Sequence, residues 1–213
     1  YNILNDAIPG IEKSHAIENI RLAAEKLRGK DVKPDEFYGM VFQDSDVAKW
    51  IEAAAYALAA GEDPELEKAV DETIQLYGAS QHEDGYVDSY FTVKCPDKMW
   101  TNICDAHELY CAGHMMEAAV AYYEVTGKRE LLDIMSKSAD CIYEQFMKKN
   151  TRAYPGHPEV ELALMRLWRA TGNEKYKELA KHFVDVRGQA PNYFVEEKKN
   201  RGWNVWDGTE ELN

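Results

Sequence analysis

The chain has 213 residues, of which 45% are hydrophobic and 30% charged, and its formal net charge is −13. This length and hydrophobic content suffice for one globular domain with a sizeable core. The acidic surplus argues against a nucleic-acid partner, because a phosphate-binding surface needs clustered lysine and arginine. The sequence has no run of about 18 apolar residues, so we expect no membrane partner.

Four cysteines are too few to staple a chain of this length with disulfides, and they predict reduced thiols in a cytoplasmic protein: Cys95, Cys104, Cys111 and Cys141. Cys104 and Cys141 are expected to be buried as small hydrophobic side chains. The sequence shows no signal-peptide pattern. It opens at Tyr1 without a methionine, so we expect that a preceding segment was removed or left out.

Helical periodicity runs through most of the chain, and glycines separate the segments. We expect seven helices, over 15–28, 46–60, 64–79, 102–126, 129–146, 159–171 and 173–186. Pro64 stands in the first turn of the third helix, where proline is well tolerated. Residues 80–101 are expected to form a loop, and the tail after Gly188 shows no clear periodicity.

Segment 119–128 resembles segment 164–173, and 53–62 is a looser third copy. In the two closer copies a helix ends at a Thr-Gly pair and a second helix follows, with Gly127 and Gly172 lying 45 residues apart. Each unit is an αα-hairpin with a tight turn. Such hairpins must pack side by side, because one hairpin cannot bury its apolar face alone.

The first helix of each hairpin is small and apolar, as at 53–55 and 118–121, whereas the second is more charged, as at 177–181. This difference predicts an all-α fold in which the first helices form a buried inner ring and the second helices an outer ring. An open solenoid is the alternative. Three hairpins are too few to close a ring of six, so we expect part of a larger toroid.

Polar motifs precede all three inner helices, at 42–46, 100–108 and 156–159. Inner helices of such a ring run parallel, so their starts share one rim, where unpaired N–H groups and positive dipole ends suit a polar ligand. Ordinary helix capping is the alternative for Asp44, Ser45 and Asp46, which are favoured N-cap residues.

Histidines stand out among these motifs. His157 precedes Pro158, which places its imidazole near the start of a helix. His107, Cys111 and His114 fall on one face of the fourth helix and are residue types that bind zinc. They do not form the His-Glu-x-x-His pattern, and one helix face rarely supplies a whole site, so we predict no metal site here.

Four motifs, in order along the chain, make it resemble glycoside hydrolase family 127: FQDSDVAKWIEA at 42–53, DGYVDSYF at 84–91, HELYCAGH at 107–114 and GHPEVELAL at 156–164. With the trailing Asp185–Gly188, the resemblance covers about residues 35–188. It implies an (α/α)6 barrel, usually followed by β-sandwich domains, that releases L-arabinofuranose from β-linked glycans with retention. Residues 1–213 would form the first portion of that catalytic domain, an incomplete (α/α)6 toroid built from αα-hairpins.

The resemblance also implies roles for individual residues. His107 and His157 look like sugar-binding residues that hydrogen-bond furanose hydroxyls. Further candidates for the pocket lining are Gln43, Asp44 and Glu108. The family's nucleophile is a cysteine thiolate bound to zinc, a metal that lowers the pKa of a thiol.

The family's zinc ligands lie in the second half of the barrel. We therefore expect the catalytic residues beyond Asn213, no cofactor in this chain, zinc in the full-length enzyme, and no activity for this chain alone. An incomplete ring also exposes apolar surface, which predicts self-association or a missing C-terminal half as partner.

Two other hypotheses stay open. The chain could be a non-catalytic helical-repeat scaffold for a protein partner, or belong to another sugar enzyme on the same toroid, such as an epimerase or an unsaturated glucuronyl hydrolase. A scaffold predicts a continuous exposed groove along one helix face, whereas the polar and aromatic residues gather at helix starts. Fold alone does not separate the enzymes, and the four motifs favour family 127.

Overall fold

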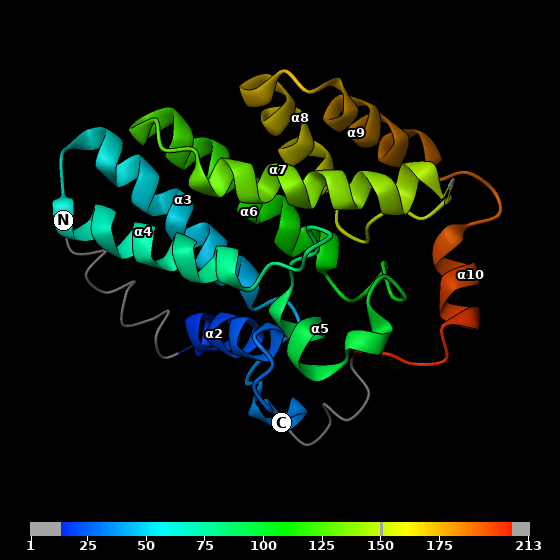
Figure 1. The fold of residues 1–213 in the computed structure, drawn as a ribbon. Helices are drawn as coiled ribbons and strands as arrows, with labels where there is room; N and C mark the ends of the chain where they lie inside the picture. Colours follow the sequence, from blue (N-terminus) through cyan, green and yellow to red (C-terminus); the bar gives the residue numbers. More distant parts are fainter. Residues whose placement is uncertain (1–13, 150, 206–213) are drawn as a thin grey trace.

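The computed structural model describes residues 14–149 and 151–205, and all regular structure within these ranges is helical (Figure 1). The α-helices are α2 (Ala16–Leu27), α3 (Asp44–Ala60), α4 (Pro64–Ala79), α5 (Ser89–Lys94), α6 (Glu108–Thr126), α7 (Glu130–Tyr143), α8 (Val160–Thr171), α9 (Glu174–Val186) and α10 (Tyr193–Asn200). Shorter turns are η1 (Pro34–Glu36), η2 (Pro96–Lys98) and the π-turn η3 (Glu144–Lys148). The prediction of an all-α fold is confirmed.

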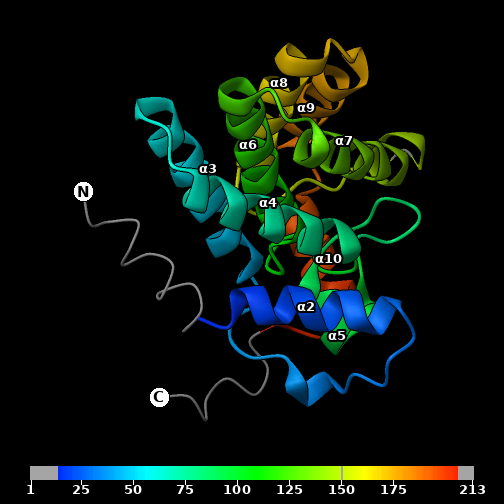
Figure 2. The same ribbon diagram turned by 60° about the vertical axis from the view of Figure 1, so that its left-hand side comes forward.

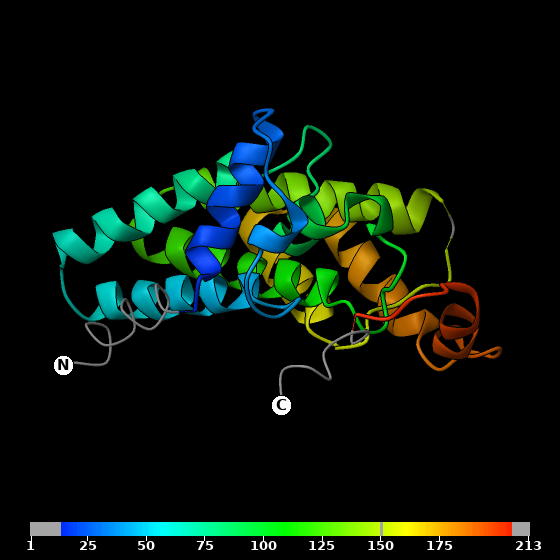
Figure 3. The ribbon, with the colours of Figure 1, turned by 90° about the horizontal axis from the view of Figure 1, so that it is seen from below.

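The helices of the three hairpins, α3, α4 and α6 to α9, form two layers. In the first layer α6 packs between α3 and α8, and in the second α7 contacts both α4 and α9. Figure 3 shows α4 and α7 along one side of the molecule and α3 along the other. The predicted hairpins α3–α4, α6–α7 and α8–α9 therefore stand side by side, with their first helices in one layer. Closure of these layers into a ring stays a prediction.

The sequence of each layer reflects its surroundings. The central helix α6 is covered on most sides, and its run Ala118–Ala121 is buried throughout. A helix covered all round has to be apolar all round. In the outer helix α9, by contrast, the buried side chains Tyr176, Leu179, Ala180 and Phe183 form one stripe. That spacing of three and four residues gives a helix one apolar face and leaves the other to water.

Two of the three hairpin turns use glycine for its conformational freedom. Gly127 and Gly172 adopt left-handed φ angles of 73° and 74°. Each donates its N–H to the carbonyl four residues earlier, at 2.8 and 2.7 Å. The looser copy of the repeat differs here, since Gly61 is extended with φ 174°.

The connections differ from the prediction in three places. The expected loop 80–101 contains α5, whose N-terminus is capped by the Asp88 carboxylate accepting from Phe91 N at 3.0 Å. The fourth predicted helix begins at Glu108 rather than at 102, because residues 102–107 form turns. The tail contains α10, which lies apart from the layers in Figure 1. The helices α5 and α10, with six and eight residues, are too short for helical periodicity to show.

A smaller apolar cluster ties the N-terminal part to the layers. It joins α2, the η1 segment and α5 through Leu22, Ala23, Val32, Phe37 and Val93. Figure 2 shows α2 and α5 below α4. None of the helices in the described parts of the chain has the length and apolar character needed to cross a bilayer.

Replacing Gly127 with alanine should destabilise the protein, because alanine in left-handed backbone costs about 1–2 kcal/mol. The matched control is Gly61→Ala, since neither glycine has an atom within 4 Å of its added Cβ and only the backbone angle differs. Urea unfolding followed by circular dichroism should show a lower free energy of unfolding for G127A than for G61A. Equal values would contradict the role given to the left-handed turn.

Candidate functional site

Two histidines meet where the first-layer helices begin. His107 immediately precedes α6 and His157 lies three residues before α8. Their Nε2 atoms are 3.0 Å apart, and their ring centroids are separated by 4.8 Å. The rim expected from the sequence thus brings both imidazoles to one place.

The hydrogen-bond partners assign the tautomers of this pair. His107 Nδ1 lies 2.7 Å from the backbone carbonyl oxygen of Asp105, which can only accept, so Nδ1–H donates. The Nε2 of a neutral His107 then accepts from His157 Nε2–H. Burial lowers the pKa of His107, and the facing imidazole of His157 lowers it further. The neutral form of His107, which the hydrogen bonds to Asp105 and His157 require, is therefore favoured.

Two glycines allow the start of α8 to approach α6 so closely. A Cβ on Gly156 would lie 1.9 Å from the carbonyl oxygen of Cys104, and Gly156 N donates to the Ile103 carbonyl at 3.3 Å. A Cβ on Gly113 would lie 3.0 Å from the backbone of Val160. Only glycine fits the first position without a shift of backbone, and this contact holds His157 beside His107.

Aromatic rings surround the pair. The ring of Phe42 lies 5.2 Å from that of His107, and the ring of Tyr110 lies 5.5 Å from His107 and 5.1 Å from His157. Lys49 Nζ donates to the Tyr110 hydroxyl at 3.1 Å. The depression beside the imidazoles measures about 10 Å³, room for one water molecule.

Gln43 and Asp44 are buried and bonded within the protein. Gln43 Oε1 accepts from Met40 N at 2.9 Å, while Nε2 donates to the Ser14 carbonyl at 2.6 Å. Asp44 accepts from the backbone N–H of Ser89 at 2.7 Å and from its hydroxyl. Burial raises the pKa of Asp44. Both side chains hold the start of α3 in place, and sugar contact by either stays a prediction.

Glu108 points into the protein although it follows His107 directly. It is 3% exposed, and its Oε1 accepts from Tyr86 OH at 2.7 Å and from Trp100 N at 3.0 Å. Burial raises the pKa of Glu108 to about 8. A second buried acid, Asp88, was not among the predicted site residues, and burial raises its pKa well above the ordinary range. Contact of Glu108 with a sugar stays a prediction.

Charged residues continue from the rim along the first layer. Arg166 on α8 pairs with Glu52 on α3 at 3.0 Å and with Glu117 on α6 at 3.3 Å. His114 is half-buried, with Nδ1 3.4 Å from Glu159 Oε1. Burial, with the charges of Glu117 and Glu52, raises the pKa of Glu159 to about 7. Sequence reasoning missed this group, because its members come from three helices.

None of the four thiols is activated. Burial raises the pKa of Cys95 to about 11 and of Cys104 and Cys141 to about 12, and it raises that of Cys111 well above the ordinary range. All four are free. Cys141 is buried as expected, but Cys104 is only half-buried, because it lies at the rim.

The zinc-capable residues of α6 do not converge. His107 is bonded to Asp105, Cys111 is buried, and His114 faces Glu159. Among residues 14–149 and 151–205, no three histidine, cysteine or acidic side chains are grouped so that they could hold a metal ion. The side chains of the described residues therefore do not fit the zinc site that the resemblance implies for the complete enzyme.

Side-by-side helical hairpins whose first helices lie in one layer define the protein as an αα-hairpin domain. A family model described as beta-L-arabinofuranosidase, GH127 catalytic domain, matches residues 3–212. The curated non-reducing end beta-L-arabinofuranosidase of Bifidobacterium longum subsp. longum is 43% identical over 195 residues, which is 88% of this chain and 28% of that protein.

Solved structures agree. A GH127 beta-L-arabinofuranosidase from Geobacillus stearothermophilus T6 is 54% identical with a TM-score of 0.84, covering 95% of this chain and 31% of its own. The GH127 beta-arabinofuranosidase BT3674 is 34% identical with a TM-score of 0.78, covering 87% and 30%. The chain belongs to the GH127 family of β-L-arabinofuranosidases, which decides against the epimerase and glucuronyl hydrolase hypotheses. It spans less than a third of the length of these relatives.

The buried Glu108 should make stability depend on pH. Its pKa is about 8 in the folded protein against an ordinary 4.5, so the folded state keeps a proton that the unfolded state releases between these values. This contribution is complete below pH 4.5 and falls by about 1.4 kcal/mol per pH unit as pH rises toward 8.

Glu108→Gln, which imitates the protonated acid, should remove that contribution. Urea unfolding at several pH values between 5 and 8 should give a flatter profile for E108Q than for the unmodified chain. Parallel profiles would show that Glu108 is ionised in the folded protein.

Proposed function

We propose that this chain forms the first portion of the catalytic domain of a β-L-arabinofuranosidase and contributes His107 and His157 to sugar binding. The observation that carries the proposal is the hydrogen-bonded imidazole pair at the helix starts, with His157 exposed to solvent. The names of the relatives support the substrate class. Location in the cytoplasm stays a prediction, which the four free thiols support.

The geometry suits a neutral furanose. With its Nε2–H donating to His107, a neutral His157 presents Nδ1 as an acceptor for a sugar hydroxyl. The rings of Phe42 and Tyr110 offer apolar edges for the C–H groups of the sugar. In this proposal Gln43 and Asp44 position the start of α3 behind the site.

We assign the nucleophile and its zinc ligands to residues outside these 213. The raised pKa values of all four thiols support this assignment, since a protonated thiol is a poor nucleophile and a poor metal ligand. Zinc bound in the complete enzyme would supply a thiolate at neutral pH. The residues described here bind and orient the sugar.

The chain alone should therefore bind an arabinofuranoside weakly and hydrolyse none. Its binding of methyl β-L-arabinofuranoside can be followed by NMR chemical-shift changes, with release of nitrophenol from nitrophenyl β-L-arabinofuranoside as the activity assay. His107→Ala and His157→Ala should each weaken binding about fivefold to tenfold, the free energy of one ordinary hydrogen bond.

His182→Gln, which changes a histidine of the outer helix α9, serves as the matched control. The D-enantiomer of the ligand serves as the control for specificity. Equal affinities for the H107A, H157A and H182Q variants would rule out the imidazole pair as the sugar site, and turnover by the isolated chain would refute its inactivity.

The first layer also presents apolar side chains to solvent. Tyr56 on α3 and Leu162 on α8 are 55% and 57% exposed. Exposed apolar surface of this kind favours association, so the isolated chain should form dimers or larger species whose proportion rises with concentration. Leu162→Ser should lower that proportion in sedimentation velocity, whereas Val184→Ser on α9 should not. A single monomer boundary at all concentrations would contradict this expectation.

A further inference from the structure

We infer that Glu197 and Arg201, which follow the hairpin α8–α9 in sequence, are positioning residues for His107. They fix the turn 102–105, whose last carbonyl group sets the tautomer of the His107 ring. This inference rests on the proposed role of His107 in sugar binding, but each link is a contact within the chain.

Glu197 holds the backbone of the turn. Its side chain is almost fully buried, and Oε2 accepts from Ile103 N at 2.8 Å and from Tyr193 OH at 2.6 Å. Oε1 accepts from Cys104 N at 3.0 Å. Two successive N–H groups are thus bound by one carboxylate, an arrangement in which a hydrogen bond to a charged acceptor is stronger than one between neutral groups.

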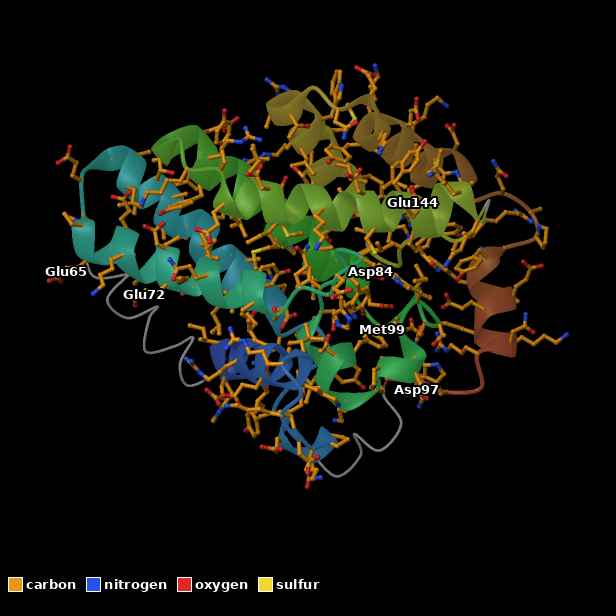
Figure 4. All side chains as sticks on the ribbon, viewed as in Figure 1. Glu65, Glu72, Asp84, Asp97, Met99 and Glu144 are labelled. Carbon is orange, nitrogen blue, oxygen red and sulfur yellow. The ribbon has the colours of Figure 1, made fainter. Side chains whose placement is uncertain are left out.

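Arg201 holds the side chains of the same turn. Its side chain is 5% exposed, with Nη2 2.7 Å from Asp105 Oδ2 and Nη1 donating to Asn102 Oδ1. Nη1 also lies 3.3 Å from Glu197 Oε1, and Nε donates to the Trp203 carbonyl at 2.8 Å. The planar guanidinium fork satisfies these acceptors together, which a lysine ammonium would not reproduce. Figure 4 labels Asp97 and Met99 on the segment that leads into the turn, between α5 and α10.

Asp105 connects this cluster to the site. Its side chain is bound by Arg201, its N–H donates to Asn102 Oδ1 at 3.0 Å, and its carbonyl accepts from His107 Nδ1 at 2.7 Å. The backbone of His107 has a left-handed φ of 62°, which costs about 1–3 kcal/mol and persists only where the surroundings impose it. The cluster around Arg201 supplies such surroundings.

The Asp105 carbonyl determines which ring nitrogen of His107 carries the proton. If the Asp105 carbonyl moved away, His107 would be released to carry its proton on Nε2. His107 Nε2–H would then face His157 Nε2, so the hydrogen bond between the rings would have to reverse its direction. His157 would then present Nδ1–H as a donor in place of an acceptor. Arg201 thus acts on the sugar site through Asp105, without touching it.

The test uses the 213-residue chain labelled with 15N-histidine, without any sugar. Long-range 1H–15N spectra report which ring nitrogen carries the proton, and the His107 signals are assigned by their loss in H107N. The unmodified chain should show His107 in the Nδ1–H form. Arg201→Gln and Glu197→Gln should each lower the ratio of Nδ1–H to Nε2–H about fivefold to tenfold, the free energy of one hydrogen bond.

Lys199→Gln is the matched control, because Lys199 is an exposed residue of the same helix α10. K199Q should keep the tautomer ratio of the unmodified chain. Far-ultraviolet circular dichroism shows which variants are folded. If R201Q does not fold, the tautomer ratio of His107 in E197Q tests the inference.

An Nε2–H form of His107 in the unmodified chain, or an unchanged ratio in a folded R201Q or E197Q variant, would overturn the inference. Because no ligand is present, failure of sugar binding leaves this result intact. A normal tautomer without sugar binding would refute the proposed function alone.

Discussion

The site depends on one backbone contact, between Gly156 and the carbonyl of Cys104. A side chain at position 156 would overlap that carbonyl, with a Cβ only 1.9 Å from its oxygen. Van der Waals repulsion at such a distance forces backbone apart. The segment before α8 would then leave the turn before α6, and the two imidazoles could not stay at hydrogen-bond distance. A glycine without a side-chain role therefore sets the spacing of His107 and His157.

The hairpins could be predicted from the sequence because their signals are local. Helix ends at Gly127 and Gly172 follow from the need for left-handed backbone, and the repeated Thr-Gly pairs identify the unit. The segments α5 and α10 could not be predicted in this way. They have six and eight residues, and contacts with distant parts of the chain stabilise them.

The histidine pair could be inferred from the motifs, whereas its supports could not. Glu197 lies 94 residues from Ile103, and no local pattern relates the two. The prediction also grouped Glu108 with its neighbour His107, yet one points inward and the other to the rim. His107 has left-handed backbone just before α6, whereas Glu108 is the first residue of the helix, so their side chains leave the chain in different directions. A motif that starts a helix therefore divides its side chains between the core and the ligand.

The distribution of charge fits the binding of a neutral ligand. The chain as a whole is strongly acidic, but Glu108 at the start of α6 is buried, and burial raises its pKa to about 8, so it is mostly protonated at pH 7. The carboxylate of Asp105 is matched by Arg201. Exposed acids such as Glu65 and Glu72 stand on the outer helix α4 (Figure 4), whereas the Lys49 ammonium reaches the rim and donates to the Tyr110 hydroxyl at 3.1 Å. The rim thus combines an oriented imidazole pair with one cationic donor, and a few convergent polar groups of this kind fix the orientation of a ligand's hydroxyls.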